Sequence, residues 1–113
     1  MNLTGTWVSD DYDCPWGVAH TEVVTIIQDG DRITGTKVTG DDCVPAGDVT
    51  FSGVLRADSE TVSVSWVVGH PHAPASGRHP GTIAIASPNL LLATAPGWRE
   101  MRFRRVELDV PWR

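Results

Sequence analysis

The stretch GTKVTGDDCVPAGDVTF, residues 35–51, decides how this chain folds. Apolar and β-branched residues at its two ends are typical of strands, and turn residues lie between them. Gly40 and Gly47 permit backbone angles closed to other residues, and Pro45 fixes φ and stiffens the connection. The stretch therefore predicts two strands joined by a rigid acidic loop that carries Asp41 and Asp42.

Short runs of alternating residues flank this stretch on both sides. Val62, Val64 and Trp66 alternate with small polar residues, which is the period of a half-buried strand, and no long window has helical spacing. The eight predicted strands are Leu3–Val8, His20–Gln28, Arg32–Gly40, Asp48–Arg56, Thr61–Gly69, Gly81–Ala86, Asn89–Ala95 and Trp98–Val106. Without a crossover-length helix, they predict one all-β domain over residues 1–113, an eight-stranded antiparallel up-and-down barrel.

The short connections between strands fall at one end of the predicted barrel and the long connections at the other. Short turns such as Asp29-Gly30-Asp31 fall at one end. The other end receives the long loops Ser9–Ala19, Asp41–Gly47 and His70–Pro80, and a shorter one at Pro96-Gly97. Small barrels place ligands at their mouth, so the long-loop end is the predicted site.

The charge of the chain limits its partners. It has 14 acidic and 9 basic residues, a net charge of −5 and a single lysine, Lys37. Nucleic acid and anionic membranes both require a positive field, so neither is an expected partner. No segment has the length of a membrane span, and the N-terminus lacks the pattern of a secretory signal, so we expect a cytoplasmic protein.

Gly5-Thr6-Trp7 resembles the Gly-x-Trp signature of lipocalins and related barrels. In those proteins an arginine from the last strand lies across the tryptophan, and Arg102 or Arg104 is the expected counterpart, as a cation–π pair. The resemblance implies a lipocalin-like barrel. The same region is also similar to avidins, but the acidic run after Ser9 departs from the biotin-reading pattern and argues against biotin binding.

A more specific resemblance covers about Tyr12 to Gly53. TKVTGD (residues 36–41) followed by VPAG (44–47) resembles the signature of a β-barrel domain shared by two proteins. One is an F-box receptor that reads C-terminally amidated proteins and D-type cyclins, and the other is EXECUTER, through its C-terminal domain. The resemblance implies recognition of a peptide end or small ligand at the mouth, with Asp41 as a main contact. The F-box helices and the long helical region of EXECUTER have no counterpart in this sequence.

Two cysteines, Cys14 and Cys43, fall in two loops at the same mouth. Free thiols, a disulfide joining the loops, and metal ligation with His70, His72 or His79 remain alternatives. His-Pro-His is not a strong zinc spacing, so no metal site and no cofactor is predicted.

Lys37 lies on the same predicted strand face as Ile33, Gly35 and Thr39. If that face is the lumen, Lys37 is a buried cation that needs a carboxylate, and Glu22 on the neighbouring strand is the candidate. If the face is exposed, Lys37 is an ordinary surface lysine. We favour the lumen.

These observations predict non-catalytic binding of a peptide end or a small neutral or cationic ligand at the mouth. An ionised carboxylate accepts hydrogen bonds but donates none, so it suits an amide, ammonium or guanidinium group. The predicted binding residues are Asp41, Lys37, Thr39, Asp42, Tyr12, Trp16 and Trp66, although packing is the simpler role for Trp66. The alternatives are a small cyclase or isomerase that uses the same cavity, and an interaction scaffold with a filled core. The sequence does not indicate an oligomeric state.

Overall fold

The fold is that of a computed structural model, which describes residues 2–10, 22–39, 46–55, 60–68, 77–94 and 100–106. Eight strands make up these ranges, and none of the ranges contains a helix able to span a membrane. The strands are β1 (Gly5–Ser9), β2 (Val23–Asp29), β3 (Arg32–Lys37), β4 (Val49–Val54), β5 (Thr61–Val68), β6 (Gly77–Ser87), β7 (Leu90–Thr94) and β8 (Met101–Val106). All eight match predicted strands in order.

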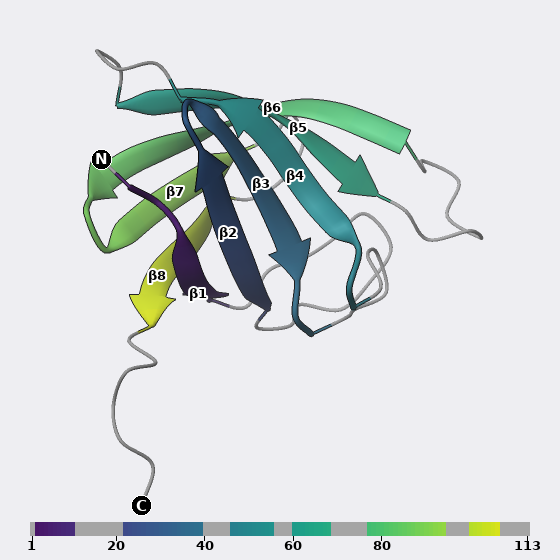
Figure 1. Cartoon of the computed structure of the whole chain (residues 1–113), viewed down its shortest axis with the longest axis horizontal. Helices are drawn as coiled ribbons and strands as arrows, with labels where there is room; N and C mark the ends of the chain where they lie inside the picture. The colour runs from purple at the N-terminus through teal and green to yellow at the C-terminus, as the bar shows by residue number, and fades with distance from the viewer. Residues whose placement is uncertain are drawn as a thin grey trace, which may run out of the picture.

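The strands pair in sequence order into a closed antiparallel barrel (Figure 1). Each strand pairs with its neighbours in the chain, and β1 closes the barrel by pairing with β8 from Thr6↔Val106 to Ser9↔Phe103. Closure removes the free sheet edges that an open eight-stranded sheet would leave. The predicted eight-stranded up-and-down architecture is therefore confirmed.

The start of β6 was predicted wrongly. Arg78, His79 and Pro80 were placed in a long loop, but they lie in β6, which begins at Gly77 and pairs with β5 from Val68↔Gly77 onward. Proline is usually a strand breaker because it has no N–H to donate. Here Pro80 is exposed and pairs with Ser65 of β5. It lies in the part of β6 that has no pairing with β7, which begins only at Thr82.

The interior of the barrel is filled by side chains from alternate positions on every strand. The largest aromatic side chains in it are Trp7, Phe51, Trp66 and Phe103, each 2% exposed or less. Phe51 and Trp66 pack with ring centroids 5.0 Å apart and an interplanar angle of 60°. A Cβ at Gly35 would overlap the Phe51 ring, so a glycine is required where this ring crosses β3.

An arginine closes the short-turn end of the barrel. Arg105 lies directly across from Trp7 in the β1–β8 register, and its guanidinium stacks over the Trp7 ring at 4.4 Å. It also donates hydrogen bonds to the backbone oxygens of Thr4 and Asn2, both at 2.9 Å, and of Pro88 at 3.1 Å. These bonds tie both ends of the described chain to the β6–β7 turn.

The cation–π pair was expected, but the arginine was predicted wrongly. Arg102 and Arg104 are exposed because the alternation that buries Met101 and Phe103 turns them outward. Arg105 lies near the end of β8, and its guanidinium covers the Trp7 ring at the short-turn end of the barrel.

Replacing this arginine should therefore destabilise the barrel. We expect Arg105→Met to lower the free energy of unfolding by about 1–3 kcal/mol, because it removes charged hydrogen bonds and a cation–π contact. Arg104→Met is the matched control, because Arg104 is exposed and its ion pair with the exposed Asp10 is 3.8 Å long. Urea unfolding of both variants measures the difference, and equal midpoints would show that Arg105 contributes nothing special.

Candidate functional site

The mouth of the barrel is defined here as the end where β1, β3, β5 and β7 finish and the other four strands begin. The chain leaves the barrel at this end after Ser9, Lys37, Val68 and Thr94. All four long connections therefore join strands at the mouth, as the sequence predicts. Tyr12, Trp16, Asp41 and Asp42 lie outside the described residues, as do Cys14, Cys43, His70 and His72, so their predicted roles stay predictions.

Four polar side chains are buried among the described residues, and all belong to the mouth end of β1–β4. They are Ser9, Glu22, Lys37 and Thr50. Ser9 and Lys37 end their strands, Glu22 precedes β2, and Thr50 lies near the start of β4. Strand pairing is irregular beside Thr50, where Thr36 pairs with Val49 and Gly35 with Phe51. The extra residue explains why Thr50 and Phe51 are both buried although they are adjacent.

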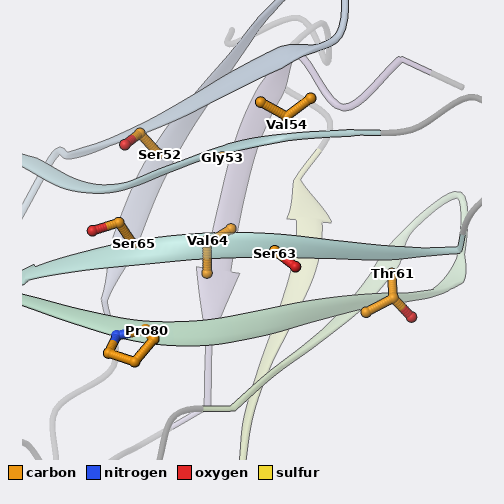
Figure 2. Close-up of a pocket in the computed structure, with 8 residues that line it drawn as sticks. All are labelled: Ser52, Gly53, Val54, Thr61, Ser63, Val64, Ser65 and Pro80. Carbon is orange, nitrogen blue, oxygen red and sulfur yellow. The ribbon is translucent and has the colours of Figure 1, made fainter.

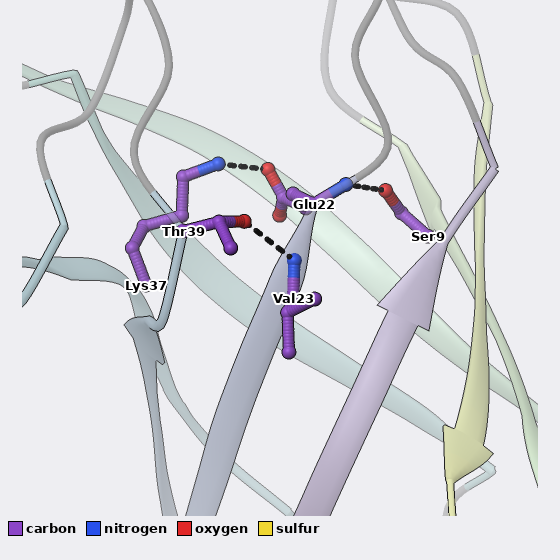
Figure 3. A network of polar contacts seen from close by, with 5 residues as sticks. All are labelled: Ser9, Glu22, Val23, Lys37 and Thr39. Atoms are coloured by element: carbon purple, nitrogen blue, oxygen red, sulfur yellow. Dashed lines mark hydrogen bonds and ion pairs between the residues drawn. The ribbon is translucent and has the colours of Figure 1, made fainter.

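A buried ion pair is the centre of this polar group (Figure 3). The Lys37 ammonium donates to Glu22 Oε2, and the two side chains are 0% and 4% exposed. Lys37 lies on the same inward face as Ile33, with Gly35 between them. The prediction that Lys37 faces the lumen and pairs with Glu22 is confirmed.

Backbone hydrogen bonds hold both members of the pair in place. Glu22 and Ser9 are joined twice, because the Glu22 N–H donates to Ser9 Oγ and the Ser9 N–H to the Glu22 carbonyl, both at 2.9 Å. On the other side, the Lys37 N–H donates to the Asp48 carbonyl at 2.9 Å, and the Gly47 N–H to the Lys37 carbonyl at 2.8 Å. The two charged side chains therefore extend from anchored backbone.

Burial shifts both ionisation equilibria toward the neutral forms. It raises the pKa of the Glu22 carboxyl above its ordinary value of 4.5, and the charge of Lys37 opposes this shift. It lowers the pKa of the Lys37 ammonium below 10.5, and Glu22 opposes that shift. In both groups desolvation is the largest cause, so the pair is held together at a cost in stability.

One carboxylate oxygen of this pair is not used within the described residues. Glu22 Oε1 is buried and accepts no hydrogen bond from any of them. A carboxylate has two acceptor oxygens, and leaving one of them buried without a donor is unfavourable. The arrangement can therefore accept a further N–H or O–H donor next to an ammonium group.

Two other predicted binding residues are described, and both make structural contacts. Thr39 was expected on the Lys37 face, but it is exposed because β3 ends at Lys37 and the alternation stops there. Its Oγ1 accepts a hydrogen bond from the Val23 N–H at 3.2 Å (Figure 3). Trp66 is 2% exposed and packs on Phe51, which agrees with the packing role. Their roles in binding remain predictions.

Sequence reasoning missed Ser9 and Thr50 as parts of the polar group. Ser9 has a sequence signal, because it lies two residues after Trp7 and therefore on the same strand face. Thr50 has none, since its burial depends on the irregular pairing of β3 with β4. No group of three or more His, Cys, Asp or Glu side chains in the described ranges is placed to hold a metal ion.

Comparisons of the chain with protein-family models, with curated proteins and with solved structures found no match.

The ion pair predicts the direction in which the free energy of unfolding changes with pH. A carboxyl whose folded pKa is raised contributes stability that is fully present below pH 4.5 and is lost as pH rises through its folded pKa. Lys37→Met removes the charge that opposes this shift, so the loss should extend to higher pH than in the wild type. In this range the free energy of unfolding of Lys37→Met should fall by about 1.4 kcal/mol per pH unit.

Urea unfolding over a pH series measures this effect. The matched control is Glu22→Leu/Lys37→Met, which replaces both charges by apolar side chains and should be as stable as the wild type or more so, by up to about 4 kcal/mol. A Lys37→Met curve parallel to that of the wild type would contradict the assignment of the pair.

Proposed function

We propose that this protein is a non-catalytic binding protein that recognises a peptide end or a small neutral or cationic ligand at the mouth of the barrel. The observation that carries the proposal is the buried Glu22–Lys37 pair, in which Glu22 Oε1 accepts no hydrogen bond from the residues that the structure describes. Apolar side chains at these two positions would avoid the cost of burying charges. A role in binding therefore explains the buried pair better than a role in stability does.

The chemistry of the pair favours one class of end group. Glu22 Oε1 accepts a hydrogen bond, and the Lys37 ammonium beside it is a donor. A primary amide is complementary to such a pair because its NH₂ donates and its carbonyl accepts. A free carboxylate brings a second negative charge against Glu22 in a desolvated environment, which is unfavourable. A C-terminal amide is therefore the preferred peptide end.

The motif between β3 and β4 supports the same class of ligand. TKVTGD (36–41) and VPAG (44–47) resemble the signature of the barrel domain of the F-box receptor of amidated proteins and of EXECUTER. In this proposal Asp41 supplies a second acceptor, and Tyr12 and Trp16 cover the ligand. Lys37 belongs both to this motif and to the buried pair.

The filled interior limits how deeply a ligand enters. Phe51 and Trp66 are directly paired on the neighbouring strands β4 and β5, and their buried rings pack against each other on the inner face of the barrel. This packing favours an end group or a small molecule at the mouth over a long apolar ligand along the barrel axis. It equally favours the alternative of an interaction scaffold with a solid core. The cyclase or isomerase alternative has no comparable support, since Glu22 and Lys37 engage each other.

Binding of matched peptides tests the proposal. The probes are short N-acetylated peptides of varied sequence, each made with a C-terminal amide and with a free carboxylate, titrated into the protein and followed by NMR. We expect the amides to bind at least about tenfold more tightly than the acids, as the gain or loss of one charge-assisted hydrogen bond predicts.

Glu22→Gln should abolish this preference, and Glu22→Leu/Lys37→Met should do so in a variant that is expected to be fully stable. Glu60→Gln is the control, because Glu60 is exposed beside β5 at the short-turn end. Equal affinity for amide and acid, or an unchanged preference in the Glu22 variants, would refute the proposed role of the pair.

A further inference from the structure

One edge of β6 is open at the mouth of the barrel, because β6 is much longer than β7. β6 has 11 residues and pairs with β5 from Gly77 to Ala84. β7 has 5 residues, and its pairing with β6 begins only at Thr82↔Thr94. In Figure 1 the start of β6 lies to the right, beside β5, whereas β7 lies to the left. Closure of the barrel therefore leaves the first part of β6 with a described strand on one side only.

The strand register shows which backbone groups face this open edge. In an antiparallel pair, successive residues direct their N–H and C=O groups alternately toward the partner strand and away from it. The Ile85 N–H donates to the Glu60 carbonyl at 2.7 Å, so the odd-numbered residues of β6 face β5. The register continues without a shift from there to Gly77. Arg78 and Pro80 therefore direct their backbone groups away from β5.

The open edge presents one hydrogen-bond donor and two acceptors. Pro80, which lies beside Ser65 of β5 in Figure 2, has no N–H, so its carbonyl is its only backbone hydrogen-bonding group. Arg78 contributes both its N–H and its carbonyl. None of these three groups pairs with a strand on that side in the part of the chain that the structure describes, and both residues are exposed. The edge can therefore accept a further strand.

We propose that this edge binds an extended peptide by strand addition, at the position where β7 would continue. Residues that face the same neighbour are about 6.7 Å apart along a strand, a spacing that another extended chain reproduces. The peptide supplies a carbonyl to the Arg78 N–H and two N–H groups, two residues apart, to the carbonyls of Arg78 and Pro80. The inference rests on the proposed function and specifies its ligand as a peptide rather than a small molecule.

The edge and the buried ion pair lie on opposite sides of the mouth. β6 begins at the mouth, and β2, which Glu22 precedes, is four strands away in either direction around the closed barrel. A bound peptide therefore places its backbone on β6 and its end group at Glu22. Three edge hydrogen bonds alone give weak binding, and their combination with an end-group contact on the same ligand strengthens both.

Variants of the edge in the full chain test this proposal. The probes are the N-acetylated peptide amides and acids described above, titrated and followed by NMR. Arg78→Pro removes the edge donor, and Arg78→Ala loses the same side chain but keeps that donor. We expect Arg78→Pro to bind peptide about two- to tenfold more weakly than Arg78→Ala, as the loss of one hydrogen bond predicts.

Pro80→Ala tests the edge in the opposite direction. It adds an N–H group at an exposed position that faces away from β5, so it should bind peptide about two- to tenfold more tightly than the wild type. A poorly folded variant would not show such a gain. In the peptide, N-methylation should weaken binding at two residues separated by one tolerant residue, because only alternate residues face β6.

The outcomes separate strand addition from recognition of the end group. Equal affinity of Arg78→Pro and Arg78→Ala, with no gain in Pro80→Ala, would overturn strand addition even if amides bind more tightly than acids. The expected edge effects with equal affinity for amides and acids would support strand addition and refute the role of Glu22. Absence of peptide binding altogether would overturn both.

Discussion

Pairing of β1 with β8 closes the sheet into a barrel, and this closure decides which side chains are buried. Once the first and last strands pair, every strand has two neighbours, and each residue faces either the lumen or the solvent. Arg105 reinforces this closure by stacking on Trp7 and binding the backbone of the N-terminal segment. Inward-facing residues have no route to water except at the two ends. A charged residue on the inward face therefore has to be paired or placed close to an end.

Lys37 and Glu22 satisfy both conditions. They lie at the mouth end of β3 and β2 and pair with each other, while the lumen beyond them is filled by Phe51 and Trp66. Desolvation still shifts both groups toward their neutral forms, so the pair does not contribute to stability in the way an apolar pair would. The physical basis of the proposed binding site is a costly charged pair at the end where the long connections meet, with one carboxylate oxygen that has no donor in the described part of the chain.

The sequence predicts the architecture well because the architecture follows from alternation. Val62, Val64 and Trp66 alternate with polar residues, and the same reasoning applied from Ile33 to Lys37 placed the lysine inside and found Glu22 as its partner. The predictions were wrong where register or strand ends decide the outcome. Arg105 rather than Arg102 or Arg104 covers Trp7 because it is the residue opposite Trp7 in the β1–β8 pairing. Thr39 is exposed because β3 ends two residues before it.

Features that combine several strands are beyond a single sequence. The burial of Thr50 requires the irregular pairing of β3 and β4, and the open edge of β6 requires the joint register of β5, β6 and β7. Neither leaves a pattern in one segment. Pro80 shows the reverse case, in which a strong local signal for a loop is overruled by pairing with β5.

The ionisation state of Lys37 reports directly on the buried ion pair. Because Lys37 is the only lysine, selective ¹⁵N labelling of lysine gives a single side-chain signal without ambiguity. We expect an ammonium group whose protons exchange slowly with water, whose signal responds to Glu22→Gln, and whose pKa lies below the ordinary 10.5. A rapidly exchanging ammonium with an ordinary pKa and no response to Glu22→Gln would contradict the buried pair, and the binding site built on it would fall.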